Sequence, residues 1–328
     1  MKQRGIIVTV VTVVIVAVLL MLLVRKPGSG HEKVIAIATL MSQPALNAVQ
    51  HNLIEELKKE GYAEGKNVHY IIRNANGQLQ LSASIASELV ADNPDVIVPI
   101  TTPMAQAVVA AKPKCPVVFA AVTDPVGAGI VKSLDVGEKN VTGTSDAWPY
   151  KDQLALIKRI TPGVKKLGVL FNPGEAASQY GMKQIRKYAP AMGFELVEGP
   201  VSSTNDVYAV AQSLASRADA LFLSSDNTVI SGMAAALKVA VQHKIPLYVG
   251  DSGTVEKGGL AAVSVGYAQL GTETGKLVGR VLNGEHYIPT YVAHGSEIYL
   301  NTRAAQLMGV KIPQTILSEA TKVYTEIK

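Results

Sequence analysis

Short apolar segments alternate with amphipathic ones along most of this chain. Each apolar run is rich in β-branched residues and lacks polar alternation, which is typical of strands buried on both faces of a parallel sheet. The runs occupy residues 34–40, 68–73, 96–100, 117–121, 167–171, 196–199, 220–223, 247–250 and 260–265. The segments between them place apolar residues at helical spacing, and these segments cover residues 44–59, 79–90, 104–111, 151–160, 180–192, 207–214, 232–242 and 269–282.

The alternation of strands and helices occurs twice, and it predicts an α/β fold with two Rossmann-like lobes, each built on a parallel sheet. The first series runs through residues 34–121 and the second through residues 167–250. Residues 140–150 are interpreted as a crossover between the lobes, and residues 292–300 as a late strand. We expect a three-segment hinge, with one lobe made of residues 31–146 and 251–290 and the other made of residues 147–250 and 291–328.

The first 30 residues are of a different kind. An uncharged, apolar stretch at residues 6–24 would span about 28 Å as a helix, close to the thickness of a bilayer core. Basic residues flank it and no small-residue cleavage site follows it, so the sequence predicts an N-terminal transmembrane helix with a linker up to residue 30. A signal peptide cut between residues 28 and 30 is the alternative. Either way, we expect the remaining chain to lie outside the cytoplasm, in the periplasm or at the cell surface.

Composition and charge exclude several classes of function. The net charge of +5 comes from scattered Lys and Arg residues without interleaved aromatics, which argues against nucleic-acid binding. Cys115 is the only cysteine, so the chain forms no intramolecular disulfide and offers no thiolate metal site. The sequence contains no G-x-S-x-G nucleophile elbow, no phosphate-binding P-loop and no H-E-x-x-H zinc motif. We therefore expect neither catalysis, nor a cofactor, nor a bound metal.

Polar residues follow almost every predicted strand, at the edge where parallel sheets bind their ligands. Each has an ordinary explanation as a helix N-cap or a loop-ordering residue, but their joint occurrence in both halves indicates a ligand site between the lobes. The hydroxyls and helix N-termini suit a carboxylate, and the aspartates suit an amine or hydroxyl groups. The candidate ligand-binding residues are Ser42, Gln43, Thr101, Thr102, Thr123, Asp124, Ser145, Asp146, Asn172, Ser178, Asp226, Asn227 and Asp251.

Five segments carry a resemblance to a known family, namely residues 97–103 (IVPITTP), 116–129 (PVVFAAVTDPVGAG), 141–146 (VTGTSD), 168–175 (GVLFNPGE) and 258–261 (GGLA). With them, the chain resembles the extracytoplasmic substrate-binding proteins of ABC transporters over residues 33–313, in particular the family with tryptophan- and tyrosine-binding members. The resemblance implies the type I periplasmic binding protein fold, a ligand trapped by hinge closure, and an ABC permease with its ATPase as partners. Many relatives carry a lipid-attachment cysteine near the N-terminus, and this chain has none.

The predicted function is therefore capture of a small solute by the extracytoplasmic component of an ABC importer, with delivery to the permease. An amino acid, in the narrowest form an aromatic one, is the favoured ligand, although a hydroxylated ligand suits the same residues. We expect a monomer, because nothing in the sequence demands a dimer. The alternative is a membrane-tethered protein that presents its ligand to a signalling receptor. Candidates for stacking on a ligand ring, each explained as well by core packing, are Phe119, Trp148, Tyr150, Tyr180 and Tyr267.

Overall fold

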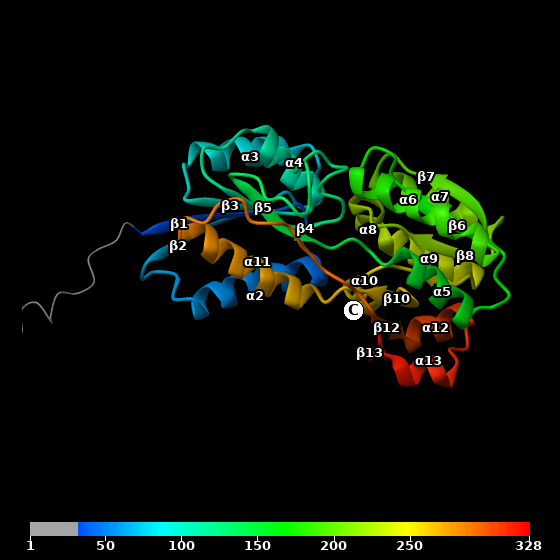
Figure 1. Ribbon diagram of the computed structural model, residues 1–328. Coiled ribbons are helices and arrows are strands. Elements are labelled where there is room, and N and C mark those ends of the chain that lie inside the picture. Colours follow the sequence, from blue (N-terminus) through cyan, green and yellow to red (C-terminus); the bar gives the residue numbers. More distant parts are fainter. Residues whose placement is uncertain (1–31) are drawn as a thin grey trace, which may run out of the picture.

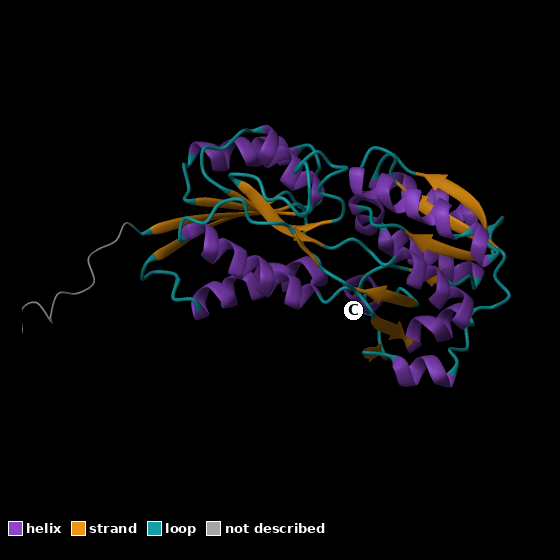
Figure 2. Ribbon diagram, in the orientation of Figure 1, coloured by secondary structure: helices purple, strands orange, loops and turns teal. Residues whose placement is uncertain are grey.

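The computed structural model describes residues 32–328, which form two α/β lobes lying side by side. In each lobe, helices cover a central sheet on both faces (Figures 1 and 2). Each lobe has its own large cluster of buried apolar side chains, and a smaller cluster around Phe119 lies beside the first lobe's sheet. Two separate cores make two bodies that can move relative to one another, joined only by crossing segments and surface contacts.

The first lobe is built on a parallel sheet with the strand order β11-β5-β4-β3-β1-β2. Its strands are β1 (Lys33–Thr39), β2 (Val68–Asn74), β3 (Val96–Ile100), β4 (Val117–Val122), β5 (Val141–Ser145) and β11 (Tyr291–Val292). On one face lie α3 (Leu81–Ala91) and α4 (Thr102–Ala110), and on the other α2 (Pro44–Lys59) and α11 (Tyr267–Leu282) (Figure 1). All strands run the same way, so their carboxyl ends gather at one edge, which faces the second lobe.

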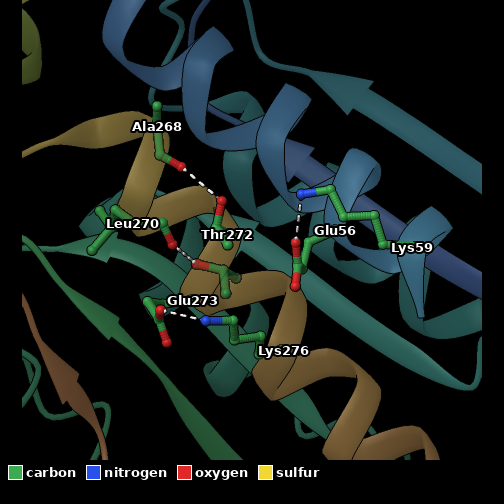
Figure 3. Close-up of polar contacts among 8 residues, drawn as sticks. Glu56, Lys59, Ala268, Leu270, Thr272, Glu273 and Lys276 are labelled. Atoms are coloured by element: carbon green, nitrogen blue, oxygen red, sulfur yellow. Dashed lines mark hydrogen bonds and ion pairs between the residues drawn. The ribbon is translucent and has the colours of Figure 1, made fainter.

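The helices α2 and α11 pack closely against each other, although they come from opposite ends of the chain. A Cβ atom at Gly275 would lie 2.9 Å from the Leu53 carbonyl oxygen, and one at Gly271 would overlap the Val49 carbonyl oxygen. Only glycine therefore permits this approach. Figure 3 shows polar side chains of this pair that are bonded within their own helices, as in the ion pairs Glu56–Lys59 at 3.0 Å and Glu273–Lys276 at 2.8 Å.

The second lobe combines two sheets. The larger is parallel with the order β7-β6-β8-β9, and the smaller has the order β10-β12-β13 with an antiparallel first pair. The strands are β6 (Lys166–Phe171), β7 (Glu195–Pro200), β8 (Ala220–Leu223), β9 (Leu247–Tyr248), β10 (Ala261–Ser264), β12 (Glu297–Asn301) and β13 (Lys322–Tyr324). The helices are α5 (Tyr150–Ile160), α6 (Ala176–Tyr188), α7 (Val207–Ala215), α8 (Asn227–Ser231), α9 (Met233–His243), α10 (Ser252–Glu256), α12 (Thr302–Met308) and α13 (Gln314–Glu319), with 3₁₀ turns at Pro190–Met192 and Thr204–Asp206.

Each of the apolar runs identified in the sequence coincides with a strand, but the segment 140–150 is only in part the crossover that was predicted. Its first half is β5, in which Val141 is followed by four buried Thr, Gly and Ser residues. A Cβ at Gly143 would overlap the carbonyl oxygen of Phe119 on β4, so glycine is needed for the two strands to pair here. The polar sequence of β5 hid a buried strand because small residues, rather than large apolar ones, fit between its neighbours.

Two of the three crossings between the lobes lie at other positions than predicted. The strand β10 pairs with β12 and belongs to the second core, so residues 251–264 lie in the second lobe rather than the first. The strand β11 pairs with β5 and therefore belongs to the first lobe. The predicted late strand at 292–300 is thus divided between the lobes. The crossings follow β5, β10 and β11, at residues 146–149, 265–266 and 293–296.

The predicted transmembrane helix at residues 6–24 lies outside the described part of the chain. Within residues 32–328, no helix is both long enough and apolar enough to cross a bilayer. The first strand, β1, begins at Lys33, at the amino end of the first sheet. The chain therefore enters the first lobe at the end opposite to the edge that faces the second lobe (Figure 1).

A candidate ligand site between the lobes

A cavity lies where the carboxyl ends of the two parallel sheets face each other. The space between its walls is about 370 Å³, open solvent included. Candidate residues from both halves of the sequence line it, namely Gln43, Thr101, Thr102, Thr123, Asp146, Asp226, Asn227 and Asp251. The remaining lining residues are Leu46, Ala121, Trp148, Ala177, Ser225, Ile230 and Tyr267.

The other candidate residues have local tasks near this cavity. Ser42 is exposed and bonds Asn47, while Asp124 accepts a hydrogen bond from the Gly127 N–H at 2.9 Å. Ser145 donates its hydroxyl proton to the Thr123 carbonyl oxygen at 3.2 Å. Two more, Asn172 and Ser178, are buried in the second lobe behind the cavity. None of these five residues lines the cavity.

On the first lobe, Thr101 stands at the start of α4 in an unusual conformation. Its φ of 90° is rare for a residue with a side chain, and Ala121, at the end of the neighbouring strand β4, also has a positive φ of 51°. The Thr101 hydroxyl does not cap the helix, and it has no hydrogen-bond partner among the described residues although the residue is only 4% exposed. A buried hydroxyl without a partner at a helix N-terminus is an obvious place for an anionic acceptor group.

Gln43 is a second incompletely bonded group on this lobe. It directly precedes α2, is 8% exposed, and its Oε1 atom has no hydrogen-bond partner within residues 32–328. By contrast, the neighbouring Thr102 is engaged, because its Oγ1 atom accepts a hydrogen bond from the Thr123 N–H at 3.3 Å. The first lobe thus offers the cavity one free hydroxyl and one free amide oxygen.

The second lobe contributes the carboxyl group of Asp226, which hydrogen bonds from backbone N–H groups of the same lobe hold in place. One oxygen of Asp226 accepts a hydrogen bond from the Val229 N–H at 2.8 Å, and the other accepts one from the Asn172 N–H. Glu175 fixes the residues that follow, since it accepts hydrogen bonds from Asn227 Nδ2 at 2.7 Å and from Thr228 Oγ1 at 2.6 Å.

Glu175 was missed as a functional residue by the sequence reasoning. It lies in the segment 168–175 that carries part of the family resemblance, and that position was the available signal.

Burial makes the carboxyl groups of the cavity reluctant to ionise. It raises the pKa of Asp226 to about 7, and the nearby negative charge of Glu175 adds to this rise. Burial also raises the pKa of Asp146 to about 6, partly offset by the hydrogen bonds from Tyr267 and Thr123, and it raises the pKa of Asp251. No Lys, Arg or His side chain of the described residues lines the cavity, so the site favours a ligand that brings its own positive charge.

Two aromatic residues line the cavity, and the other three stacking candidates do not. Trp148 donates its indole N–H to the Tyr267 hydroxyl at 3.0 Å, and both side chains are buried. Phe119 packs in the small cluster beside the first sheet, whereas Tyr150 and Tyr180 pack against each other with tilted rings whose centroids are 6.4 Å apart. Leu46 and Ile230 add apolar surface from opposite lobes, and as interior positions of α2 and α8 they gave no sequence signal.

The lobes touch each other at the cavity. The hydroxyls of Thr123 and Ser225, which belong to different lobes, lie 3.2 Å apart. Ser231 also contacts the sulfur of Met41 at 3.7 Å from the opposite lobe. The described conformation is therefore one in which the lobes are closed on each other. Among residues 32–328, no group of three or more His, Cys, Asp or Glu side chains is placed to hold a metal ion.

Comparisons with known proteins place this geometry in a family. Residues 34–324 match the family model for ABC transporter substrate-binding proteins. A tyrosine-binding protein of Clostridioides difficile is 36% identical over 279 residues, which cover 84% of this chain and 81% of that protein.

Two solved structures from bacteria differ in how well they superpose on this chain. A Streptococcus pneumonia domain in complex with L-Trp is 34% identical and has a TM-score of 0.85, covering 89% of this chain and 99% of that one. A substrate-binding protein of Clostridium difficile in its ligand-free, open structure is also 34% identical, but its TM-score is 0.68, with 90% and 100% covered. At equal identity, the lobes of this chain are arranged more like those of the L-Trp complex than like those of the open structure.

Proposed function

We propose that this chain, which belongs to the family of ABC transporter substrate-binding proteins, captures an α-amino acid with an aromatic side chain between its lobes and delivers it to a permease. Members of this family bind solutes and are not enzymes. The observation that carries the proposal is that one cavity offers a place for a negatively charged group on one wall and a place for a positively charged group on the other. One wall holds an unpartnered hydroxyl at a helix N-terminus, and the other holds a buried carboxyl group without a basic partner lining the cavity.

The ligand carboxylate would lie at the first turn of α4. The helix has nine residues, so its N-terminus carries an appreciable partial positive charge and several backbone N–H groups without an intrahelical acceptor. The Thr101 hydroxyl adds a donor whose burial leaves it no alternative partner in the described structure. An anionic oxygen at this position would satisfy both.

The ligand ammonium group would lie near Asp226, with Asp146 and Asp251 as the other acidic neighbours in the cavity. The raised pKa of Asp226 means that ionisation in the free cavity is costly. A nearby ammonium would offset that cost, because a positive charge within a few ångströms favours the ionised carboxylate. The unpartnered Gln43 Oε1 atom is a further acceptor for such a group.

An aromatic side chain fits the remaining wall. Leu46, Ile230 and the Trp148 ring contribute apolar surface, and aromatic rings prefer apolar or edge-to-face neighbours. The names of the relatives favour the same class, since one is a tyrosine-binding protein and another was solved with L-Trp.

Delivery would follow the transport cycle of the family. The chain would be held at the outer face of the cytoplasmic membrane by residues 6–24, or would be released there after cleavage of that segment. Ligand contacts to both lobes would shift the population towards the closed form, which docks on a permease driven by an internal ATPase. A single tether would keep the binding protein at high local concentration near its permease.

The test is calorimetry on the full chain in detergent, after unfolding and refolding to strip carried ligand. The panel contains L-tryptophan, L-tyrosine, tryptamine, indole-3-propionate and myo-inositol. We expect one of the aromatic amino acids to bind with micromolar affinity or better, and the two analogues that lack a carboxylate or an ammonium to bind at least tenfold more weakly. Binding of the polyol alone, or equal binding of the analogues, would contradict the proposal.

A further inference from the structure

The crossings between the lobes lie side by side. The backbone N–H of Ala293, on the crossing after β11, donates to the Ser145 carbonyl oxygen at 2.9 Å, where β5 leads into the first crossing. Tyr267 begins α11 directly after the second crossing, whereas Asp146 and Trp148 lie on the first. Side chains from two crossings can therefore interact at one place.

A chain of hydrogen bonds starts at this place. Trp148 donates its indole N–H to the Tyr267 hydroxyl at 3.0 Å, and Tyr267 donates in turn to Asp146 Oδ2 at 2.9 Å. Trp148 belongs to the core of the second lobe and Tyr267 to the core of the first. Each of these side chains is at least nine-tenths buried, so their relative positions are fixed by packing as well as by the hydrogen bonds.

The same carboxyl group extends the chain across the cavity. Asp146 Oδ1 accepts a hydrogen bond from Thr123 Oγ1 at 3.2 Å, and that oxygen lies 3.2 Å from the hydroxyl of Ser225 on the second lobe. Because Thr123 uses its only hydroxyl proton for Asp146, Ser225 must be the donor in the last contact. Ser225 is itself held, since its backbone N–H donates to the Tyr150 hydroxyl at 3.3 Å.

We infer that this chain of side chains, Trp148, Tyr267, Asp146, Thr123 and Ser225, is a closure latch that connects the hinge to the contact between the lobes. The inference rests on the proposed opening and closing of the lobes. Its last contact exists only when the lobes meet, and its first contacts set the angle between two crossings. The latch therefore stabilises the closed form through hydrogen bonds within the protein, which are formed in the ligand-free chain as well, and Tyr267 is its main positioning residue.

The latch is tested by measuring the distance between the lobes. Spin labels are placed on the full chain at exposed helix positions, with Ser87→Cys on α3 and Lys187→Cys on α6, and Cys115→Ala removes the native thiol. Double electron–electron resonance then gives the populations of open and closed forms, without ligand and with saturating L-tryptophan or L-tyrosine.

The decisive variant is Tyr267→Phe, which keeps the ring and removes the bridging hydroxyl. We expect the ratio of closed to open molecules to fall about tenfold at equal ligand concentration, because a hydrogen bond to a carboxylate is lost. The matched control is Tyr248→Phe, since the Tyr248 hydroxyl is also hydrogen-bonded, to Thr161 at 2.8 Å, but within the second lobe. The control should leave the ratio unchanged within twofold.

A second pair of variants tests the contact at the lobe interface. Thr123→Val removes the hydroxyl but keeps the shape of the side chain, and Thr123→Ser restores the hydroxyl. The closed population should fall with valine and recover with serine. A structural defect would not distinguish the two in this way.

Several outcomes would overturn the latch. These are an unchanged ratio in Tyr267→Phe, an equal loss in Tyr248→Phe, or a wild-type chain with no closed population under any of the conditions. If the wild-type chain binds no aromatic amino acid while Tyr267→Phe still lowers the ligand-free closed population, the proposed ligand fails and the latch stands. If the wild-type chain binds and closes but Tyr267→Phe closes equally, the latch fails and the proposed ligand stands.

Discussion

The two walls of the cavity are built in opposite ways. On the second lobe, the polar groups of Asp226, Glu175 and Thr228 already have partners inside the protein. On the first lobe, the Thr101 hydroxyl and the Gln43 Oε1 atom have none among the described residues, and the backbone at Thr101 is held at an unfavourable φ. The hydrogen bonds of one wall are therefore formed within the protein, and only the charge of Asp226 lacks a partner there, whereas the other wall leaves hydrogen-bonding groups for a ligand to satisfy.

This difference indicates which wall contributes mainly to folding stability and which contributes mainly to ligand affinity. Substitutions on the wall of the second lobe should disturb folding, because they leave buried donors without acceptors. Substitutions on the wall of the first lobe should reduce ligand affinity while folding is retained or even improved, because the groups there are held at a cost in the free protein.

Among substitutions that test this difference between the walls, Glu175→Ala is expected to have the largest effect, a loss of folding stability. It leaves both polar hydrogens of Thr228 and those of Asn227 without their buried acceptor, so the free energy of unfolding should fall by about 3 kcal/mol. Urea unfolding of the ligand-free protein measures it, with the exposed Glu195→Ala as control. A loss of stability no larger than that of the control would mean that the hydrogen bonds of Glu175 do not contribute to the free energy of unfolding.

A smaller effect, on affinity, is expected from Asp226→Asn. Removing the charge that faces the ligand ammonium should weaken binding of the cognate amino acid by about 2 kcal/mol, or roughly thirtyfold. The control is Asp219→Asn in the same lobe, which also accepts backbone N–H groups, those of Lys165 and Lys166, but lies away from the cavity. Calorimetry that finds the same affinity in both variants would remove Asp226 from the ligand site.

The buried carboxyl groups of the cavity should also make the stability of the ligand-free protein depend on pH. The folded-state pKa values of Asp226, about 7, and Asp146, about 6, lie above the unfolded value of 3.8. Their contribution to stability is therefore fully present below about pH 4 and is lost as the pH rises through about 6 to 7. We expect the ligand-free protein to lose on the order of 5 kcal/mol from these groups between those limits.

Urea unfolding at several pH values measures this loss. In Asp226→Asn, most of the dependence should be gone, because the group that titrates nearest to neutral pH is absent. A wild-type protein that gains stability over this pH range, or a variant with the full dependence, would show that these carboxyl groups do not carry it.

The smallest effect is expected from Thr101→Gly on the wall of the first lobe. Glycine adopts a φ of 90° without strain, so the free energy of unfolding should rise by about 1 kcal/mol in the ligand-free protein. Affinity for the ligand should fall at the same time, because the unpartnered hydroxyl is gone. Thr101→Ser keeps the hydroxyl and should keep the affinity. A stabilised variant with full affinity would make Thr101 a purely structural residue.

Much of the fold was accessible from the sequence, because buried parallel strands are continuous apolar runs and each of those runs is a strand. The exception, β5, is buried through small residues such as Gly143, whose fit depends on Phe119 of the neighbouring strand. The pattern of residues within β5 alone does not predict such a fit. The lobe boundaries differed for a similar reason, because pairing of β10 with β12 joins segments that are distant in sequence.

The candidate site was predictable only as a set of loops. Strand ends such as those at Thr101 and Asp226 gather by topology alone, so their positions follow from the order of the elements. Which residue in a loop turns to the cavity does not follow: Gln43 lines it, whereas the adjacent Ser42 lies at the surface. The supporting role of Glu175 depends on contacts with residues more than fifty positions away, and single-sequence patterns carry no such information.

The position of Trp148 has a practical consequence. It is the only tryptophan in the sequence, and its indole ring lies on a hinge crossing and lines the cavity. Light absorbed selectively by indole is therefore emitted from this one place, and its colour and intensity depend on the polarity and hydrogen bonding around the ring. Titration with L-tyrosine, which is almost transparent at the red edge of indole absorption, would follow the protein optically with no added dye. The fluorescence of Trp148 would therefore report whether a ligand is bound in the cavity.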